Sequence, residues 1–270
     1  MDEAARQNTP SDTIAETPAP SLSGAQLNEV LSLLPGADTV ELKVTVPAVR
    51  RRSVIERLGI DPMRAELRQI SYFDTADLRL NQQGLVVRAR RVQRKAGDSV
   101  VKLRPVIPSE LADGVRRQSG FGVEVDAMPG GFVCSARLKA KADDGMLHKV
   151  FRGRKPVRKL FTKQQRALFD DHAPDGVALD DLEILGPLNI LKLKFDPKGY
   201  SRPLVAELWF YPDGSQILEL SAKCPTEEAF EAAADTKAFL ATRGVDLSAP
   251  QQTKTRTALD MLSSVEAAPS

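Results

Sequence analysis

The amino-acid sequence predicts an α+β protein: a closed antiparallel β-barrel, or tunnel, of about eight strands with a few flanking helices. Three observations predict this fold. Short segments of alternating polar and apolar residues recur along most of the chain, and turn sequences separate them as in successive hairpins. The polar faces of these segments are charged. Their apolar faces are too extensive for a single-layer sheet, whereas a barrel with an ionic interior and a partly helix-covered outside accommodates them.

Length and composition indicate one large domain. The chain has 270 residues, of which 42% are hydrophobic and 27% charged, and this is enough for a substantial core. Residues 1–24 are rich in Pro, Ser, Thr and Ala, so we expect a disordered tail that buries little apolar surface. A single domain is expected over residues 25–264, followed by a disordered end at 265–270.

Period-2 alternation locates the strands and is clearest in Thr39–Val46. The turn sequence Pro212-Asp213-Gly214-Ser215 joins the last two strands as a hairpin. Helices are expected at 25–34, 47–58, 226–243 and 254–262, from helical spacing and glycine stops. The remaining strands are expected at Gln69–Phe73, Leu85–Arg91, Ser99–Arg104, Phe121–Asp126, Val157–Phe169, Leu182–Phe195, Pro203–Tyr211 and Gln216–Lys223.

Charged residues occupy one face of most predicted strands. Glu41 and Lys43 share a face, and Leu42 and Val44 take the other. A sheet with one solvated face gives a similar pattern, but solvated faces usually mix in Ser, Thr, Asn and Gln, whereas pairs of Arg and Lys recur here. We therefore expect an ionic lumen. Its other members are Arg88 and Arg90, Lys102 and Arg104, Glu124 and Asp126, Lys192 and Lys194, Glu207, and Glu219.

An ionic lumen predicts the chemistry of its ligand, because unpaired buried charges are costly. Basic groups can neutralise phosphoryl oxygens while carboxylates hold Mg²⁺ or Mn²⁺, hard cations that prefer oxygen ligands. The expected partner is a triphosphate-containing small molecule or a polyphosphate. Nucleic acid is not expected, since only 5% of the residues are aromatic and no exposed basic stripe with aromatic platforms is found. Charge runs at 139–141 and 152–159 are interpreted as solvated faces.

The sequence favours a cytoplasmic protein. Its N-terminus lacks the basic start and apolar region of a secretory signal, and no stretch approaches the ~20 apolar residues of a membrane-spanning helix, so no membrane partner is expected. Cys134 and Cys224 form no ligand pattern and fit a reducing compartment. With only two histidines, a histidine-rich metal site is not expected.

A block of spaced motifs begins with Val40-Glu41-Leu42-Lys43 and continues with Tyr72-Phe73-Asp74-Thr75. Its later members are Gly84, Arg88-Ala89-Arg90, Val101-Lys102-Leu103-Arg104, Glu207, Glu219 and Lys254. Over residues 37–264 this block resembles the CYTH superfamily, the class IV adenylyl cyclase and thiamine triphosphatase fold, here as a bacterial stand-alone member. The resemblance implies a triphosphate tunnel that uses a divalent metal ion, Mg²⁺ or Mn²⁺.

By this resemblance the chain is expected to be a metal-dependent triphosphatase, with no catalytic residue identified. Alternatives are a non-catalytic polyphosphate-binding module, an adenylyl cyclase-like enzyme and a polyphosphate polymerase. Thr39 replaces the first acid of the opening motif, and Ser221 stands where an acid could follow Glu219; both favour the binding module. The implied phosphate ligands are Lys43, Arg88, Arg90, Lys102, Arg104, Lys163, Lys192 and Lys254, and the implied metal ligands are Glu41, Glu124, Asp126, Glu207 and Glu219.

Overall fold

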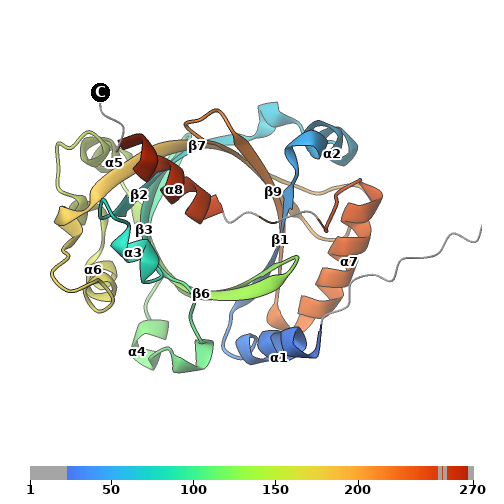
Figure 1. Ribbon diagram of the computed structural model, residues 1–270, viewed down its shortest axis with the longest axis horizontal. Helices are drawn as coiled ribbons and strands as arrows, with labels where there is room; N and C mark the ends of the chain where they lie inside the picture. Colours follow the sequence, from blue (N-terminus) through green and yellow to red (C-terminus); the bar gives the residue numbers. More distant parts are fainter. Residues whose placement is uncertain (1–22, 249–250, 252–253, 267–270) are drawn as a thin grey trace, which may run out of the picture.

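Nine strands close into one barrel in the order β1-β5-β6-β4-β3-β2-β7-β8-β9 (Figure 1). The structure is a computed structural model that describes residues 23–248, 251 and 254–266. The predicted closed barrel with flanking helices is confirmed. The strands are β1 (Thr39–Val46), β2 (Glu66–Asp74), β3 (Leu85–Val92), β4 (Lys95–Leu103), β5 (Phe121–Met128), β6 (Gly131–Ala142), β7 (Glu183–Phe195), β8 (Leu204–Phe210) and β9 (Gln216–Cys224).

One pairing differs from the antiparallel arrangement that the sequence suggested. β1 pairs antiparallel with β9 on one side but parallel with β5 on the other, and the remaining neighbours are antiparallel. Because β1 and β5 are far apart in the chain, no short hairpin fixes their relative direction. The predicted hairpin at residues 212–215 is confirmed, with Phe210 opposite Gln216 in the β8–β9 register.

The segment predicted as a strand at Val157–Phe169 is not a strand. It forms a 3-10 turn at Val157–Leu160 followed by helix α6 (Lys163–Asp170). The Thr162 side chain accepts a hydrogen bond from the Gln165 backbone, and the Gln165 side chain bonds back to the Thr162 backbone, a reciprocal cap that starts the helix. The strand that the prediction lacked is β6, whose centre carries the small residues Cys134, Ser135 and Ala136.

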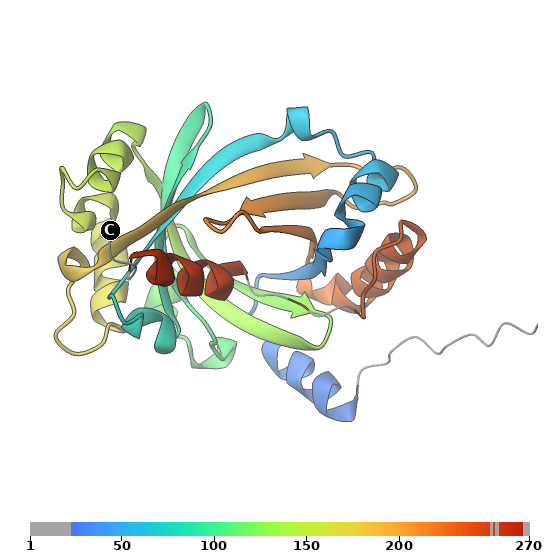
Figure 2. The ribbon, with the colours of Figure 1, turned by 45° about the horizontal axis from the view of Figure 1, so that its top comes forward.

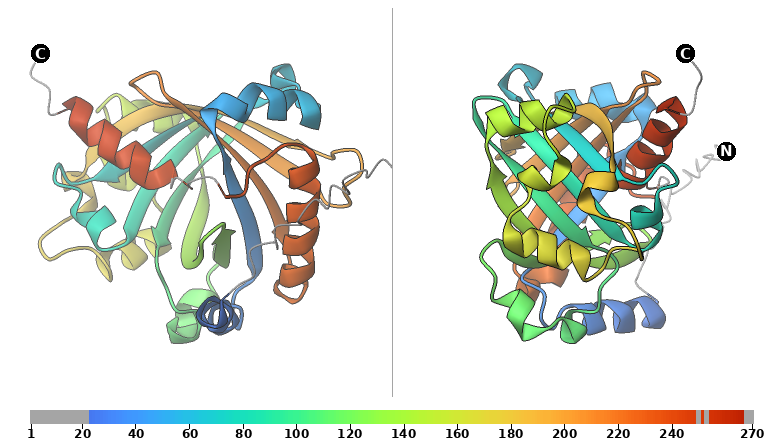
Figure 3. Two further views of the ribbon diagram at one scale, coloured as in Figure 1. Left: turned by 45° about the vertical axis from the view of Figure 1, so that its right-hand side comes forward. Right: turned by 90° about the vertical axis from the view of Figure 1, so that its left-hand side faces the viewer.

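Helices cover the outside of the barrel, and Figures 1 and 3 show α5 and α6 on one side and α2 and α7 on the other. Apolar residues of the outer strand faces pack beneath them; Val101 and Leu138, for example, share a buried cluster with Leu147 and Phe169. This packing leaves the alternate, charged positions facing the lumen. The remaining helices are α1 (Gly24–Leu33), α2 (Arg51–Leu58), α3 (Arg79–Gln82), α4 (Asp113–Arg116), α5 (Asp144–Phe151), α7 (Ala229–Thr242) and α8 (Lys254–Glu266).

Helix α8 lies across one opening of the barrel, with its first residues towards the centre (Figures 1 and 2). Its apolar side, with Ala258, Leu259 and Leu262 buried, packs with residues of β2, β7 and β8. The helix continues to Glu266, so positions 265 and 266 belong to it and not to the expected disordered end. Of the tail expected at 1–24, Ser23 caps α1 and Gly24 begins that helix; the rest of the two expected tails, at 1–22 and 267–270, lies outside the described residues. No described helix is long and apolar enough to cross a membrane.

Candidate functional site

A cavity of about 550 Å³ fills the barrel, and each of the nine strands contributes side chains to its wall. Twelve basic side chains and five acidic ones line this cavity, and three of the basic ones, Arg68, Arg90 and Lys139, pair with Glu66 or Asp98 outside its wall. The basic residues are Lys43, Arg68, Arg88, Arg90, Lys102, Arg104, Arg137, Lys139, Lys192, Lys223, Lys254 and Arg256, and the acids are Glu41, Glu124, Asp126, Glu207 and Glu219.

The structure brings together every sequence-predicted site residue except Lys163. Lys163 lies in the first turn of α6, exposed and outside the cavity wall, because its segment is a helix and not a strand. Lys194, which was expected on the charged face, is likewise exposed and does not line the cavity. Sequence reasoning missed five of the basic wall residues. They are Arg68, Arg137, Lys139, Lys223 and Arg256.

Three basic residues, Arg88, Lys102 and Arg137, form what we call the cation wall on the adjacent strands β3, β4 and β6. Lys102 stands directly opposite Arg137 in the register, an arrangement in which like charges repel. Among the described residues, no carboxylate lies within 4.0 Å of any of the three. Burial, together with nearby Lys43 and Arg104, lowers the pKa of Lys102 to about 8 against the attraction of Asp126.

Asp126 lies at the base of a second group of charges and is completely buried. Its Oδ1 accepts a hydrogen bond from Lys43 Nζ at 2.6 Å, and its Oδ2 accepts one from an Arg104 guanidinium nitrogen, also at 2.6 Å. Burial raises the pKa of Asp126, but Lys43, Lys102 and Arg104 together lower it below its usual value, so the carboxylate is ionised. Gly84 positions Arg104: the Arg104 backbone N–H donates to the Gly84 carbonyl, and a Cβ on Gly84 would lie 2.3 Å from the Arg104 carbonyl oxygen.

Glu41, Glu124 and Asp126 form the three-acid cluster, with one oxygen from each within 4.8 Å of the others. Lys43 Nζ lies 3.1 Å from Glu41 Oε2, and Lys223 pairs with Glu124 and lies 3.8 Å from Glu41. Burial opposes ionisation of Glu41, but Lys43 and Lys223 lower its pKa to about 2. Three carboxyl groups at this spacing are a donor set that fits a hard divalent cation.

The other two predicted metal ligands lie apart from this cluster. Glu207 and Glu219 face each other across β8 and β9, and Lys254, from the start of α8, bridges them at 2.7 Å and 2.5 Å. Lys192 also donates to Glu207 at 2.9 Å, and the Lys254 ammonium lies 5.0 Å from the Trp209 ring centre. Burial opposes ionisation of Glu207, but Lys254 and Lys192 hold its pKa well below its usual range. The pKa of Glu219, in contrast, is raised by burial and by the charge of Glu207.

The two positions at which the sequence departs from the motif of the family it resembles lie beside the three-acid cluster. Ser221 Oγ donates a hydrogen bond to Glu41 Oε1 at 3.0 Å, and Thr39 stands opposite Glu124 in the parallel β1–β5 register. Ser221 therefore orients a cluster carboxylate and supplies no negative charge of its own.

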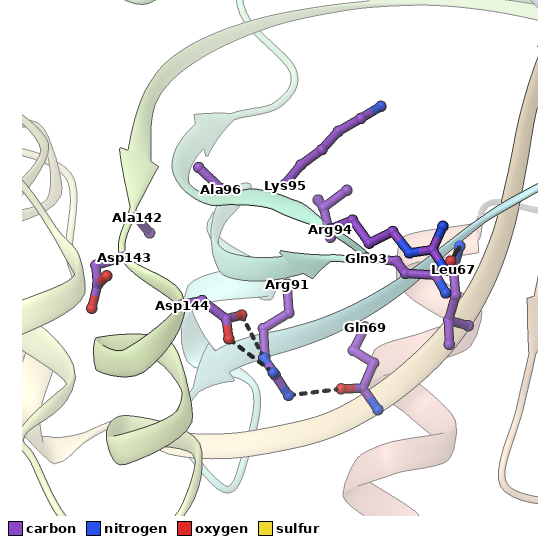
Figure 4. A pocket seen from close by; sticks show the side chains of 11 residues that line it. Leu67, Gln69, Arg91, Gln93, Arg94, Lys95, Ala96, Ala142, Asp143 and Asp144 are labelled. Carbon is purple, nitrogen blue, oxygen red and sulfur yellow. Dashed lines mark hydrogen bonds and ion pairs between the residues drawn. The ribbon is translucent and has the colours of Figure 1, made fainter.

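A second depression of about 610 Å³ lies near the β3–β4 turn (Figure 4). Arg91 is its central basic group. Its guanidinium binds the Asp144 carboxylate through two contacts of 2.8 Å and 3.0 Å and donates to Gln69 Oε1 at 3.3 Å. The guanidinium thus has partners already, in contrast to the cation wall, and the barrel cavity is the better candidate site.

Fold and cavity together define a class of protein: a closed β-barrel whose lumen carries many cations and a smaller set of acids. Solved structures of this fold include a candidate adenylate cyclase from Bacillus halodurans, which is 15% identical in sequence and has a TM-score of 0.58. The match covers 82% of this chain and 97% of the Bacillus protein. A second solved structure is a candidate adenylyl cyclase from Hippeastrum, which is described as having a dominant triphosphatase activity. It is 16% identical in sequence and has a TM-score of 0.57, and the match covers 83% of this chain and 95% of the Hippeastrum protein.

These similarities establish the fold that the resemblance to CYTH proteins implied. A scan of protein-family models finds no match to the chain, and a search of curated proteins finds none either.

Proposed function

We propose that the barrel binds a triphosphate or polyphosphate compound together with a divalent metal ion, Mg²⁺ or Mn²⁺, and hydrolyses it. The observation that carries this proposal is the cation wall. Within the part of the chain that the structure describes, these three basic groups have no carboxylate within 4.0 Å, and they lie on neighbouring strands of a cavity lined by more basic than acidic side chains. A chain of phosphates supplies closely spaced anionic oxygens that would relieve this repulsion through charge-assisted hydrogen bonds.

In this proposal the two sides of the cavity have different roles. Arg88, Lys102 and Arg137 bind phosphoryl oxygens, and Lys43 and Arg104 hold Asp126 ionised and in place. Glu41, Glu124 and Asp126 would hold the divalent metal ion, which when bound polarises a phosphoryl group. Positive charge that is fixed before the reaction stabilises the charge that develops on the transferred phosphoryl group.

A non-catalytic binding module is the second candidate, and one observation favours it. Each of the five acids in the cavity already contacts at least one lysine: Lys43, Lys192, Lys223 or Lys254. The cavity can therefore balance its own acids and still present free cations to a polyanion, which is sufficient for binding without turnover.

Phosphate release from a panel of triphosphates, with Mg²⁺ and with Mn²⁺, tests the proposal. The panel includes inorganic triphosphate, thiamine triphosphate and ATP. We expect metal-dependent release from at least one compound, abolished or strongly reduced by Lys102→Met. Lys141→Met is the matched control, because Lys141 is exposed and does not line the cavity. Tight binding without release would support the binding module, and absence of both binding and release would refute the proposal.

A further inference from the structure

Lys223 is the most exposed of the basic side chains that pair with the three-acid cluster. It is 48% exposed, compared with 16% for Lys43 and 27% for Arg104. Its ammonium group pairs with Glu124 and lies 3.8 Å from Glu41 Oε2, so it stands at the solvent side of two cluster carboxylates. Lys223 comes from β9, two positions beyond Ser221 on the same face of the strand.

The three-acid cluster and its basic partners form a charge-balanced group. The three carboxylates of the cluster are balanced by three cations, Lys43, Arg104 and Lys223. A divalent ion could join this neutral group favourably only if a cation moved away. Lys43 and Arg104 both hold the fully buried Asp126 at 2.6 Å, and loss of either would leave a buried charge short of a partner. Because the Lys223 side chain is the most exposed of the three cations, water screens its ion pairs most and it is the cation most easily displaced.

We propose that Lys223 is a built-in counter-ion, which occupies the metal position of the three-acid cluster in the metal-free protein and limits its affinity for divalent metal. This inference rests on the proposed function, because it concerns the metal site of that function. It implies that a divalent ion alone binds weakly. The ion binds well when it arrives with a polyphosphate, whose negative charge adds to that of the carboxylates.

Titration of the full-length protein with Mn²⁺ alone, followed by calorimetry and by the electron paramagnetic resonance signal of free Mn²⁺, tests the proposal. We expect Lys223→Met to bind Mn²⁺ at least about tenfold more tightly than the wild type. Lys139→Met is the matched control: Lys139 lines the cavity and is 46% exposed, but its carboxylate partner is Asp98, outside the cluster. Its Mn²⁺ affinity should equal that of the wild type. Equal affinities of Lys223→Met and the wild type would overturn the proposal.

A second measurement uses the wild-type chain and does not depend on the folding of a variant. Saturating Mn²⁺ should increase the rate at which an amine-specific acylating reagent modifies Lys223, measured by mass spectrometry, because the ion pairs that shield the amine are broken. Lys139 should be modified at an unchanged rate. An unchanged rate at Lys223 would overturn the proposal. Metal-free binding of inorganic triphosphate, measured in parallel, separates this failure from failure of the proposed function.

Discussion

Lys102 and Arg137 face each other across β4 and β6, and neither has a carboxylate neighbour within 4.0 Å in the part of the chain that the structure describes. Such a pair is stabilised by an anion between or above its members. We predict that Arg88→Ala or Lys102→Ala weakens binding of inorganic triphosphate about tenfold or more, since a charge-assisted contact contributes roughly 1.5–3 kcal/mol. The loss should appear with and without metal in isothermal titrations. An affinity no different from that of Lys141→Ala would contradict the assignment of the wall.

The protonation of Lys102 makes binding sensitive to pH. Its pKa of about 8 means that the free protein loses this positive charge as the pH rises from 7 to 9, so triphosphate affinity should fall over that interval. The bound phosphates favour the charged form, and binding at pH 8.5 should therefore take up protons. Titrations in buffers of different ionisation enthalpy measure this uptake. Lys102→Arg, whose guanidinium stays charged, should reduce both the uptake and the pH dependence; retention of both would exclude Lys102 as their source.

The variant Glu219→Gln tests whether Glu219 is a metal ligand or only the ion-pair partner of Lys254. Without metal, this variant should leave triphosphate affinity unchanged or raise it, because a negative charge near the phosphates is removed. Glu219 lies outside the three-acid cluster, so a loss of turnover or of metal-enhanced binding that appears only with Mg²⁺ or Mn²⁺ would extend the metal site beyond that cluster. Calorimetry under both conditions compares the outcomes. Equal losses with and without metal would mean that Glu219 serves only to anchor Lys254, its partner at 2.5 Å.

Regular alternation of polar and apolar residues is the signal by which the sequence predicts its strands. Thr39–Val46 alternates throughout, and the predicted bounds of β1 coincide with those in the structure. β6 was missed because small residues occupy its middle, so Arg137 and Lys139 lacked a predicted strand and were not assigned to the cavity. On β9, Lys223 shares a face with Glu219 and Ser221, and the sequence alone does not show which residue it contacts. The pairing of β9 with β1 places it opposite Glu41.

The segment of α6 shows the opposite error, in which an apolar run was interpreted as a strand. The signal that could have corrected it is the spacing of Thr162 and Gln165, a capping box. Because the Thr162 side chain caps α6, Thr162→Ala should lower the free energy of unfolding by about 1 kcal/mol, which urea denaturation measures. Triphosphate affinity should not change, because α6 lies outside the cavity. Lys163→Ala should likewise bind as the wild type does, and weaker binding by Lys163→Ala would restore that residue as a phosphate ligand.

The surplus of basic over acidic side chains in the cavity wall links ligand binding to the stability of the closed barrel. A polyanion that binds only the closed barrel stabilises it by about 2.7 kcal/mol at a concentration one hundred times its Kd. We therefore predict that inorganic triphosphate raises the melting temperature of the wild type and raises that of Lys102→Ala much less at the same concentration. Differential scanning fluorimetry measures both. Equal shifts in the two proteins would indicate binding to another part of the surface.

The parallel contact of β1 with β5 has a consequence for how the molecule assembles. β1 leaves the ribosome before every other strand, yet its two neighbours are β5, at residues 121–128, and β9, which ends at Cys224. The ring therefore cannot close until almost the whole domain has been synthesised, and contacts between such distant segments form slowly. Before the ring closes there is no lumen, so its lysines and arginines are not yet enclosed. The final folding step both joins the last edges and withdraws these charges from water, so a cellular polyanion present at that moment would favour closure.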